Sequence, residues 1–269
     1  MKNTRIHHIK VDFNVTSEIQ RYVYVYIIEA KYCYLVDSGV YGCEKQILNY
    51  LKGIGRSSED IKGIFVTHSH PDHIGTLFWF HDHTDCMIYA SEGEKRWIEN
   101  IDLQFKKRPI PNFYTLAGKS SKVDVVVQDG DMITPEEGVT LEIIRTAGHS
   151  ADGVSYRLGN AMFIGDAVPV KGDIPIMTSE SEMRETLQRL GEISSVETFC
   201  PAWDMIYTSE VMNNKLQEAN ELMDILKNAV AFLDKGQDLL ALVDEVCKEL
   251  NMGFLKSNPL FATTINCFR

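Results

Sequence analysis

The first part of the chain carries runs rich in β-branched and aromatic residues, the pattern of strands packed in a sheet. Three such runs lie at residues 5–13, 22–28 and 32–36, and the last of them stops at Asp37-Ser38-Gly39. Tyrosines fill alternate positions at the start of the second run. A period of two places them on one face of a strand. We therefore interpret the tyrosine stripe as sheet packing rather than as a surface on which a ligand stacks.

Helical and strand patterns alternate through the middle of the chain. Residues 44–52 carry apolar residues on one helical face and end at Gly53, and a helix is expected to begin near residue 71. Ser179 and Glu182 form a capping box that opens another helix. Short apolar runs predict further strands at residues 61–66, 86–89, 123–127, 139–144, 155–158 and 161–164.

The chain becomes helical from about Ser209. Apolar residues recur three and four positions apart from Leu216 to Leu233, and a second apolar helix follows Gly236. Such a seam packs more often on its own domain than on a second copy, and a homodimer is the alternative.

Composition and charge narrow the function classes. With 269 residues, of which 44% are hydrophobic, the chain is large enough to bury a core without disulfides. Its 27 basic and 38 acidic residues give a net charge of −11, which disfavours binding to nucleic acid or anionic membranes. The N-terminal residues lack a signal-peptide core, and the six cysteines form no C-x-x-C pair. We expect a cytoplasmic protein with reduced thiols.

Residues 104–122 show no clear period, and they hold much of the local positive charge. Lys106, Lys107 and Arg108 lie there, together with Pro109 and Pro111. Long irregular loops of this kind are often functional. We predict a mobile flap over the site that favours an anionic small-molecule substrate. A solvated loop with scattered lysines is the alternative.

The densest cluster of candidate ligands follows the strand at residues 61–66. His68, His70, Asp72 and His73 occur within six residues, in the pattern H-x-H-x-D-H. Burying several neutral imidazoles with a carboxylate is costly unless a cation compensates. We infer that this segment presents ligands to one metal ion or to two adjacent ions.

Two later residues fit the same site. His149 and Asp166 each follow an apolar strand and have a glycine beside them. Side chains that form a site are commonly delivered by loops at strand ends, and we therefore add both residues to the ligand set.

These motifs together resemble those of the metallo-β-lactamase-fold hydrolases, and as a set they are similar to the motifs of glyoxalase II. Thr67 to Gly75 is similar to the family's histidine signature, and Asp37-Ser38-Gly39 resembles its upstream Asp-x-Gly. Residues 146–150 and 163–166 resemble the motifs of its third histidine and its bridging aspartate. The resemblance implies an α/β fold, a four-layer αββα sandwich. The sandwich would form a catalytic domain over residues 1–210, and residues 211–269 would form a helical C-terminal extension.

The resemblance also implies a role for each residue. One metal ion would be bound by His68, His70 and His149, a second by Asp72 and His73, and Asp166 would bridge the two. Asp37 would orient the ligands by hydrogen bonds. Zinc suits this set, as one or two ions, and iron and manganese are alternatives.

One position departs from the family pattern. The family usually places a histidine after its last strand, and here Trp203 stands in that place. No histidine lies beyond His149. The second ion thus lacks its usual third ligand, and Asp204 is a candidate substitute.

The implied activity is hydrolysis by water that a metal activates, with Asp72 or Asp166 accepting the proton of the water. Thioesters, esters, lactones and phosphodiesters are the implied bonds. Two alternatives remain open. One is a mononuclear non-haem iron oxidoreductase similar to the persulfide dioxygenases, and the other is a degenerate member that binds a ligand without turnover.

Overall fold

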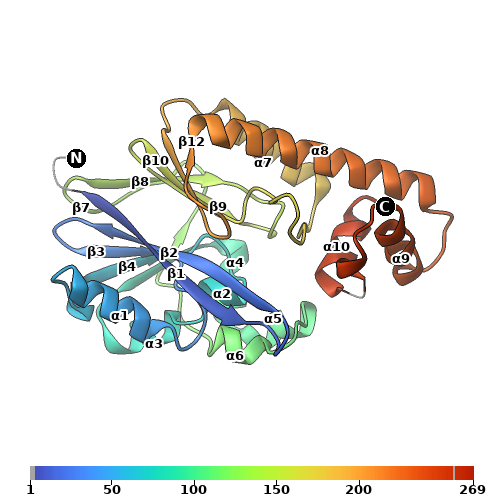
Figure 1. The fold of residues 1–269 in the computed structure, drawn as a ribbon. Helices are drawn as coiled ribbons and strands as arrows, with labels where there is room; N and C mark the ends of the chain where they lie inside the picture. The colour runs from blue at the N-terminus through green and yellow to red at the C-terminus, as the bar shows by residue number, and fades with distance from the viewer. Residues whose placement is uncertain (1–3, 257) are drawn as a thin grey trace.

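The computed structural model describes residues 4–256 and 258–269, and the strands of this part form two six-stranded sheets (Figure 1). The first sheet follows chain order: β1 (Arg5–Asn14), β2 (Gln20–Glu29), β3 (Cys33–Val36), β4 (Ile61–Phe65), β5 (Met87–Ser91) and β6 (Val125–Val127). β1 to β3 pair antiparallel, and β3 to β6 pair parallel. The carboxyl ends of β3, β4 and β5 therefore meet at one edge of the sheet.

The second sheet runs in the reverse order, from β12 to β7. Its strands are β7 (Met132–Glu136), β8 (Val139–Arg145), β9 (Val154–Leu158), β10 (Ala161–Gly165), β11 (Thr198–Pro201) and β12 (Tyr207–Thr208). β9 lies antiparallel to both β8 and β10, so β8 and β10 end at the same edge.

The helices fall between the strands and after them. They are α1 (Glu44–Gly53), α2 (Pro71–Ile74), α3 (Leu77–His83), α4 (Glu92–Ile98), α5 (Ile101–Lys107), α6 (Phe113–Ala117), α7 (Glu180–Glu192), α8 (Ser209–Leu233), α9 (Leu239–Glu249) and α10 (Pro259–Cys267), with 3-10 turns at Ser58–Asp60 and Gly253–Leu255.

Three apolar clusters lie between the four layers of the fold. Strand β2 contributes side chains to two of these clusters, one on each face of the first sheet. Val23, Val25 and Ile27 pack in the cluster that contains residues of α1 and α3. Tyr26 and Ile28 point the other way, into a cluster shared with the second sheet. Helices α7 and α8 cover the outer face of the second sheet (Figure 1). This arrangement confirms the predicted αββα sandwich. Of the tyrosine stripe, Tyr26 is buried between the sheets and Tyr24 packs against the same cluster.

The C-terminal helices share a core with the second sheet. One cluster contains Met162 and Ile164 of β10, Leu226 of α8, Leu242 of α9 and Phe261 of α10. The apolar seam of α8 is thus covered by its own chain. Within the described residues, no helix has the length and the apolar run needed to cross a bilayer.

The segment at residues 104–122 is partly helical rather than irregular throughout, and Arg108, Ile110 and Pro111 of its irregular part line a pocket together with His70 and Asp72. The segment contains the end of α5 and all of α6. Gln104 is fully buried, and the rings of Phe105 and Phe113 lie 5.3 Å apart. The ring contact orders the segment from within, and the side chain of Gln104 joins it to the ligand loop by donating to the hydroxyl of Ser69 at 3.2 Å.

Candidate metal centre

The loop between β4 and α2 brings the first ligands to the edge where the parallel strands end. His70 caps α2 with an extended backbone, and Pro71 occupies the first helical turn. His68 exposes 3% of its surface, His70 6% and His73 none. A sharp turn directly after a buried strand thus places three imidazoles below the surface.

Loops of the second sheet bring the remaining ligands. His149 follows β8 and Asp166 follows β10, so both come from the edge that faces the first sheet's loop. One potential ligand atom from each of His68, His70, His149 and Asp166 lies within 4.8 Å of the others. The structure therefore brings together the four residues that the sequence analysis placed around the first ion.

A second group shares Asp166. His73 Nε2 lies 3.4 Å from Asp166 Oδ2 and 3.8 Å from Asp72 Oδ2. All six predicted ligands therefore lie in one buried region, with Asp166 between the two groups.

The unpartnered atoms of this region test whether a cation fits. His68 Nε2, His73 Nε2 and both carboxylate oxygens of Asp166 are buried, and none has a hydrogen-bond partner among the described residues. Buried polar atoms are otherwise almost always satisfied. Nitrogen lone pairs facing a carboxylate are the donor set that a borderline-soft divalent ion such as zinc prefers. The residues present therefore fit a metal ion.

Hydrogen bonds at the opposite ring nitrogens fix how the histidines face. The Nδ1 of His149 lies 3.1 Å from the carbonyl oxygen of Ile176, which can only accept. Thr67 Oγ1 donates to Asp37 and accepts from the Nδ1 of His68 at 3.0 Å. Both rings therefore carry the proton on Nδ1 and turn the lone pair of Nε2 toward the ligand group, where His149 Nε2 lies 2.9 Å from His70 Nδ1.

Burial keeps these imidazoles neutral. It lowers the pKa of His68 and of His70 well below the ordinary value, and it lowers the pKa of His149 to about 4. The neutral form is the one that binds a metal, so these three residues are in the binding form at neutral pH.

Asp37 holds the ligand loop, as the resemblance implies. Its backbone adopts a left-handed conformation with φ of 59°. Its carboxylate accepts from the backbone N–H and the hydroxyl of Thr67, both at 2.8 Å, and lies 2.8 Å from His73 Nδ1. Burial opposes a charge on His73, but Asp166, Asp37 and Asp72 together raise its pKa well above the ordinary value.

Glu94 is a site residue that sequence reasoning missed. Its side chain, on α4, accepts from the backbone N–H and the hydroxyl of Ser69, between His68 and His70. Its other oxygen accepts from the backbone N–H of Asp152 at 3.2 Å, in the loop that carries His149. One buried carboxylate thus ties the two ligand loops together. The available signal was an acidic residue four positions before Ile98, on the buried face of a helix.

Trp203 contacts the second group directly. Its indole Nε1 donates a hydrogen bond of 3.0 Å to Asp72 Oδ2, the oxygen that faces His73. An indole N–H is a donor only and has no lone pair for a metal. The guanidinium of Arg21 lies 4.8 Å from the centre of the Trp203 ring. A donor and a cation therefore stand where the family pattern places a ligand.

Asp204 is held by its own neighbours. Its carboxylate accepts from the backbone N–H of Met205 and from the hydroxyl of Tyr207, each at 2.7 Å, and it pairs with Lys215 at 3.1 Å. The structure does not bring Asp204 into the ligand group, contrary to the substitute role considered for it.

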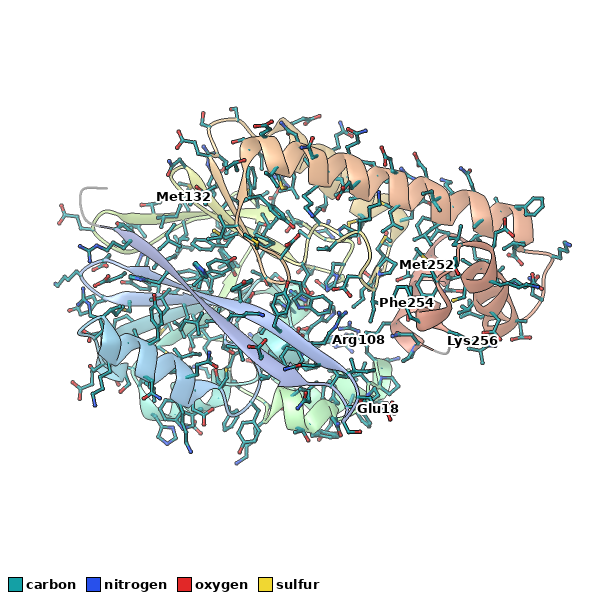
Figure 2. All side chains as sticks on the ribbon, in the orientation of Figure 1. Glu18, Arg108, Met132, Met252, Phe254 and Lys256 are labelled. Atoms are coloured by element: carbon teal, nitrogen blue, oxygen red, sulfur yellow. The ribbon has the colours of Figure 1, made fainter. Side chains whose placement is uncertain are left out.

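A pocket opens beside the ligands. About 300 Å³ of it is open to water-sized molecules, and its walls include His70, Asp72 and Trp203. The other walls come from the β1–β2 hairpin, the segment after α5, the loop between β10 and α7, and residues 254–260 at and before the start of α10. In Figure 2, Arg108 lies between the hairpin end near Glu18 and the C-terminal residues Phe254 and Lys256. A small molecule in this pocket would lie against the ligand group.

Comparison with known proteins gives the same family along most of the chain. Hydroxyacylglutathione hydrolase from Thiobacillus denitrificans is 30% identical over 142 residues, which are 52% of this chain and 43% of that protein. The hydroxyacylglutathione hydrolase of Shewanella pealeana is 24% identical over 229 residues, 82% of this chain and 77% of that protein. The chain thus aligns with less than half the length of the first relative.

Solved structures share the fold. A metallo-beta-lactamase family protein from Thermus thermophilus matches with a TM-score of 0.75 at 16% identity, over 97% of this chain and 91% of that one. A subclass B3 metallo-beta-lactamase of Bradyrhizobium japonicum matches with a TM-score of 0.62 at 20% identity, over 79% of this chain and 92% of that one. The family model of the metallo-beta-lactamase superfamily matches residues 18–197. With its motifs, its sandwich and this match, the chain belongs to the metallo-beta-lactamase superfamily.

Proposed function

We propose that this protein is a metal-dependent hydrolase that cleaves an ester-type bond of a small molecule. The observation that carries the proposal is the convergence of unpartnered ring nitrogens and carboxylate oxygens, from His68, His73 and Asp166, in a buried region next to a pocket. Two matched relatives are named hydroxyacylglutathione hydrolases, so a thioester is the first bond to assay. Esters, lactones and phosphodiesters are the other candidate bonds.

The ion is proposed to be zinc, held by His68, His70, His149 and Asp166. When bound, zinc lowers the pKa of water to about 7 and so supplies hydroxide at neutral pH. The Nδ1 hydrogen bonds of the histidines hold their rings in place for this role.

The chain's own carboxylates are proposed to handle the proton. Asp72 borders the pocket, and burial raises the pKa of its carboxyl. A raised pKa makes a carboxylate a stronger base, so Asp72 can accept a proton from an attacking water molecule. Trp203 fixes this carboxylate through its hydrogen bond to Oδ2. Asp166, with both oxygens unpartnered, is the other candidate acceptor.

The second ion is proposed to bind weakly or not at all. His73, Asp72 and Asp166 offer three ligands, and one oxygen of Asp72 already accepts from Trp203. Because this contact weakens the second ligand group, it also favours a protein with a single ion. The second candidate function is therefore a mononuclear non-haem iron oxidoreductase that uses His68, His149 and Asp166. Two histidines and one carboxylate suit iron with open positions.

Metal analysis together with a substrate panel tests the proposal. Purified protein is assayed by plasma mass spectrometry for zinc, iron and manganese, and then with a hydroxyacylglutathione thioester, a lactone and a phosphodiester. We expect hydrolysis to follow zinc content, to stop with a chelator and to return with zinc. His68→Ala should lose both metal and activity. Iron with oxygen uptake would support the oxidoreductase, and full activity without metal would overturn both functions.

A further inference from the structure

The pocket beside the ligand group combines an apolar lining with three cationic side chains. Most of its walls are apolar, and they include Phe13, Val15, Ile19, Ile110, Leu116 and Phe254. The cationic residues among its lining are Arg21, Arg108 and Lys256. Whether these charges serve the fold or a ligand depends on what each of them already contacts.

Two of the three cations have partners within the protein. Arg21 forms an ion pair with Asp173 and also lies over the ring of Trp203. The ammonium group of Lys256 lies 3.3 Å from Asp244 Oδ2. The charge of Arg21 is therefore balanced by a carboxylate, and that of Lys256 by an exposed carboxylate together with solvent.

Arg108 differs from both. Its Nη1 is buried and has no hydrogen-bond partner among the described residues. Burial lowers the pKa of Arg108 to about 10, so the guanidinium remains charged at neutral pH. Leaving a buried, charged donor unpaired costs free energy that a protein seldom retains without a use.

The nearby carboxylates do not supply the missing partner. Asp72, Glu94 and Asp166 attract the Arg108 charge, but each has other contacts. Glu94 accepts from Ser69 and Asp152, and Asp72 accepts from Trp203. Asp166 faces the histidines of the proposed metal centre, and a bound cation would balance its charge.

We propose that Arg108 is the specificity-determining residue of this pocket, and that it binds an oxyanion, a carboxylate or phosphate, on a substrate whose apolar part fills the remaining space. A guanidinium offers paired donors that match the oxygens of such a group. The placement of the scissile bond beside this anion rests on the proposed hydrolase function. The binding of the anion at Arg108 does not depend on that function. Lys106 and Lys107 of the same basic run are exposed and do not line the pocket.

Calorimetry with simple probes tests the assignment without turnover. Hexanoate, hexyl phosphate and the neutral hexanamide are titrated into the zinc-loaded full chain, as wild type, Arg108→Met and Lys107→Gln. We expect the wild type and Lys107→Gln to bind at least one anion about 10- to 100-fold more tightly than the amide. Arg108→Met should lose that preference. The anion that binds more tightly identifies the group as a carboxylate or a phosphate.

Two results would overturn the assignment. One is an anion preference that survives in Arg108→Met, because the anion would then be binding the metal alone. The other is no preference in the wild type. A thermal melt separates a structural role: Arg108→Met keeps an apolar stem and removes an unpaired charge, so its Tm should stay equal or rise. A fall of several degrees would make Arg108 a structural residue. Failure of the hydrolase assays alone would leave the calorimetry intact as a test of Arg108.

Discussion

The indole Nε1 of Trp203 donates a hydrogen bond of 3.0 Å to Asp72 Oδ2, the carboxylate oxygen that lies 3.8 Å from His73 Nε2. A residue that cannot bind a metal thus engages a residue that the family pattern uses as a ligand. The indole N–H gives Asp72 a hydrogen-bond partner. Asp72 and His73 can therefore stay buried side by side although the second ion lacks the third ligand of the family pattern.

Replacing Trp203 with histidine should strengthen the second metal group. The imidazole adds a lone pair and releases Asp72 from the indole, so the zinc content should rise from about one ion per chain toward two. Trp203→Phe is the matched control, because it removes the hydrogen bond without adding a ligand. Plasma mass spectrometry after dialysis measures the ratio. Equal zinc content in Trp203→His and Trp203→Phe would show that the indole does not limit the second group.

Glu94→Gln should weaken metal binding although Glu94 does not face the ligand group. The amide can accept from Ser69 with one oxygen only, so the tie between the two ligand loops is loosened. Outer hydrogen bonds of this kind are worth about 10- to 100-fold in metal affinity. Competition with a zinc chelator measures the change. Glu92→Gln, at an exposed position of the same helix, should bind zinc like the wild type. Equal affinities in both variants would remove the positioning role.

Gly75→Ala should damage the fold next to the site. A Cβ atom at this position would lie 2.2 Å from the backbone nitrogen of Tyr41 and 2.4 Å from the carbonyl oxygen of Leu116. These are backbone atoms that cannot move aside cheaply, so we expect the free energy of unfolding to fall by about 3 kcal/mol. Gly53→Ala in α1, where a Cβ meets nothing within 4 Å, should leave stability unchanged or slightly raised. Urea unfolding of the metal-free proteins compares the two, and equal midpoints would refute the close approach.

The buried histidines should make the metal-free protein sensitive to acid. Burial lowers the pKa of His149 from 6.5 to about 4. The unfolded chain therefore takes up a proton on His149 as the pH falls through about 6.5, while the folded chain does so only near 4. The stability that His149 contributes is complete above about pH 6.5 and is lost as the pH falls toward 4. His149→Gln should thus lose less stability than the wild type between pH 7 and pH 5 in thermal melts. Parallel losses would show that His149 titrates normally.

The ligands were predictable from sequence because their signals are local. His68, His70 and His73 follow one apolar strand within six positions, and His149 and Asp166 each follow another. Short apolar runs likewise indicated most strands of both sheets, since a strand that is buried on both faces is apolar at successive positions.

Other features depend on contacts that the sequence pattern does not report. Arg108 and Lys107 are adjacent and carry the same charge, yet only Arg108 lines the pocket, because α5 ends at Lys107 and the backbone of Arg108 is no longer helical. Glu94 joins loops that are more than fifty residues apart in the chain, and Asp204 is taken up by Tyr207 and Lys215. Each of these placements is set by tertiary packing rather than by a local motif.

Anomalous diffraction at the zinc edge tests the central claim most directly, that one ion is bound by His68, His70, His149 and Asp166. Crystals of protein loaded with excess zinc and then washed should show one strong peak among these four side chains. A second peak between Asp72 and His73 should be weak in the wild type and strong in Trp203→His. Two equal peaks in the wild type, or none at the four ligands, would contradict the account.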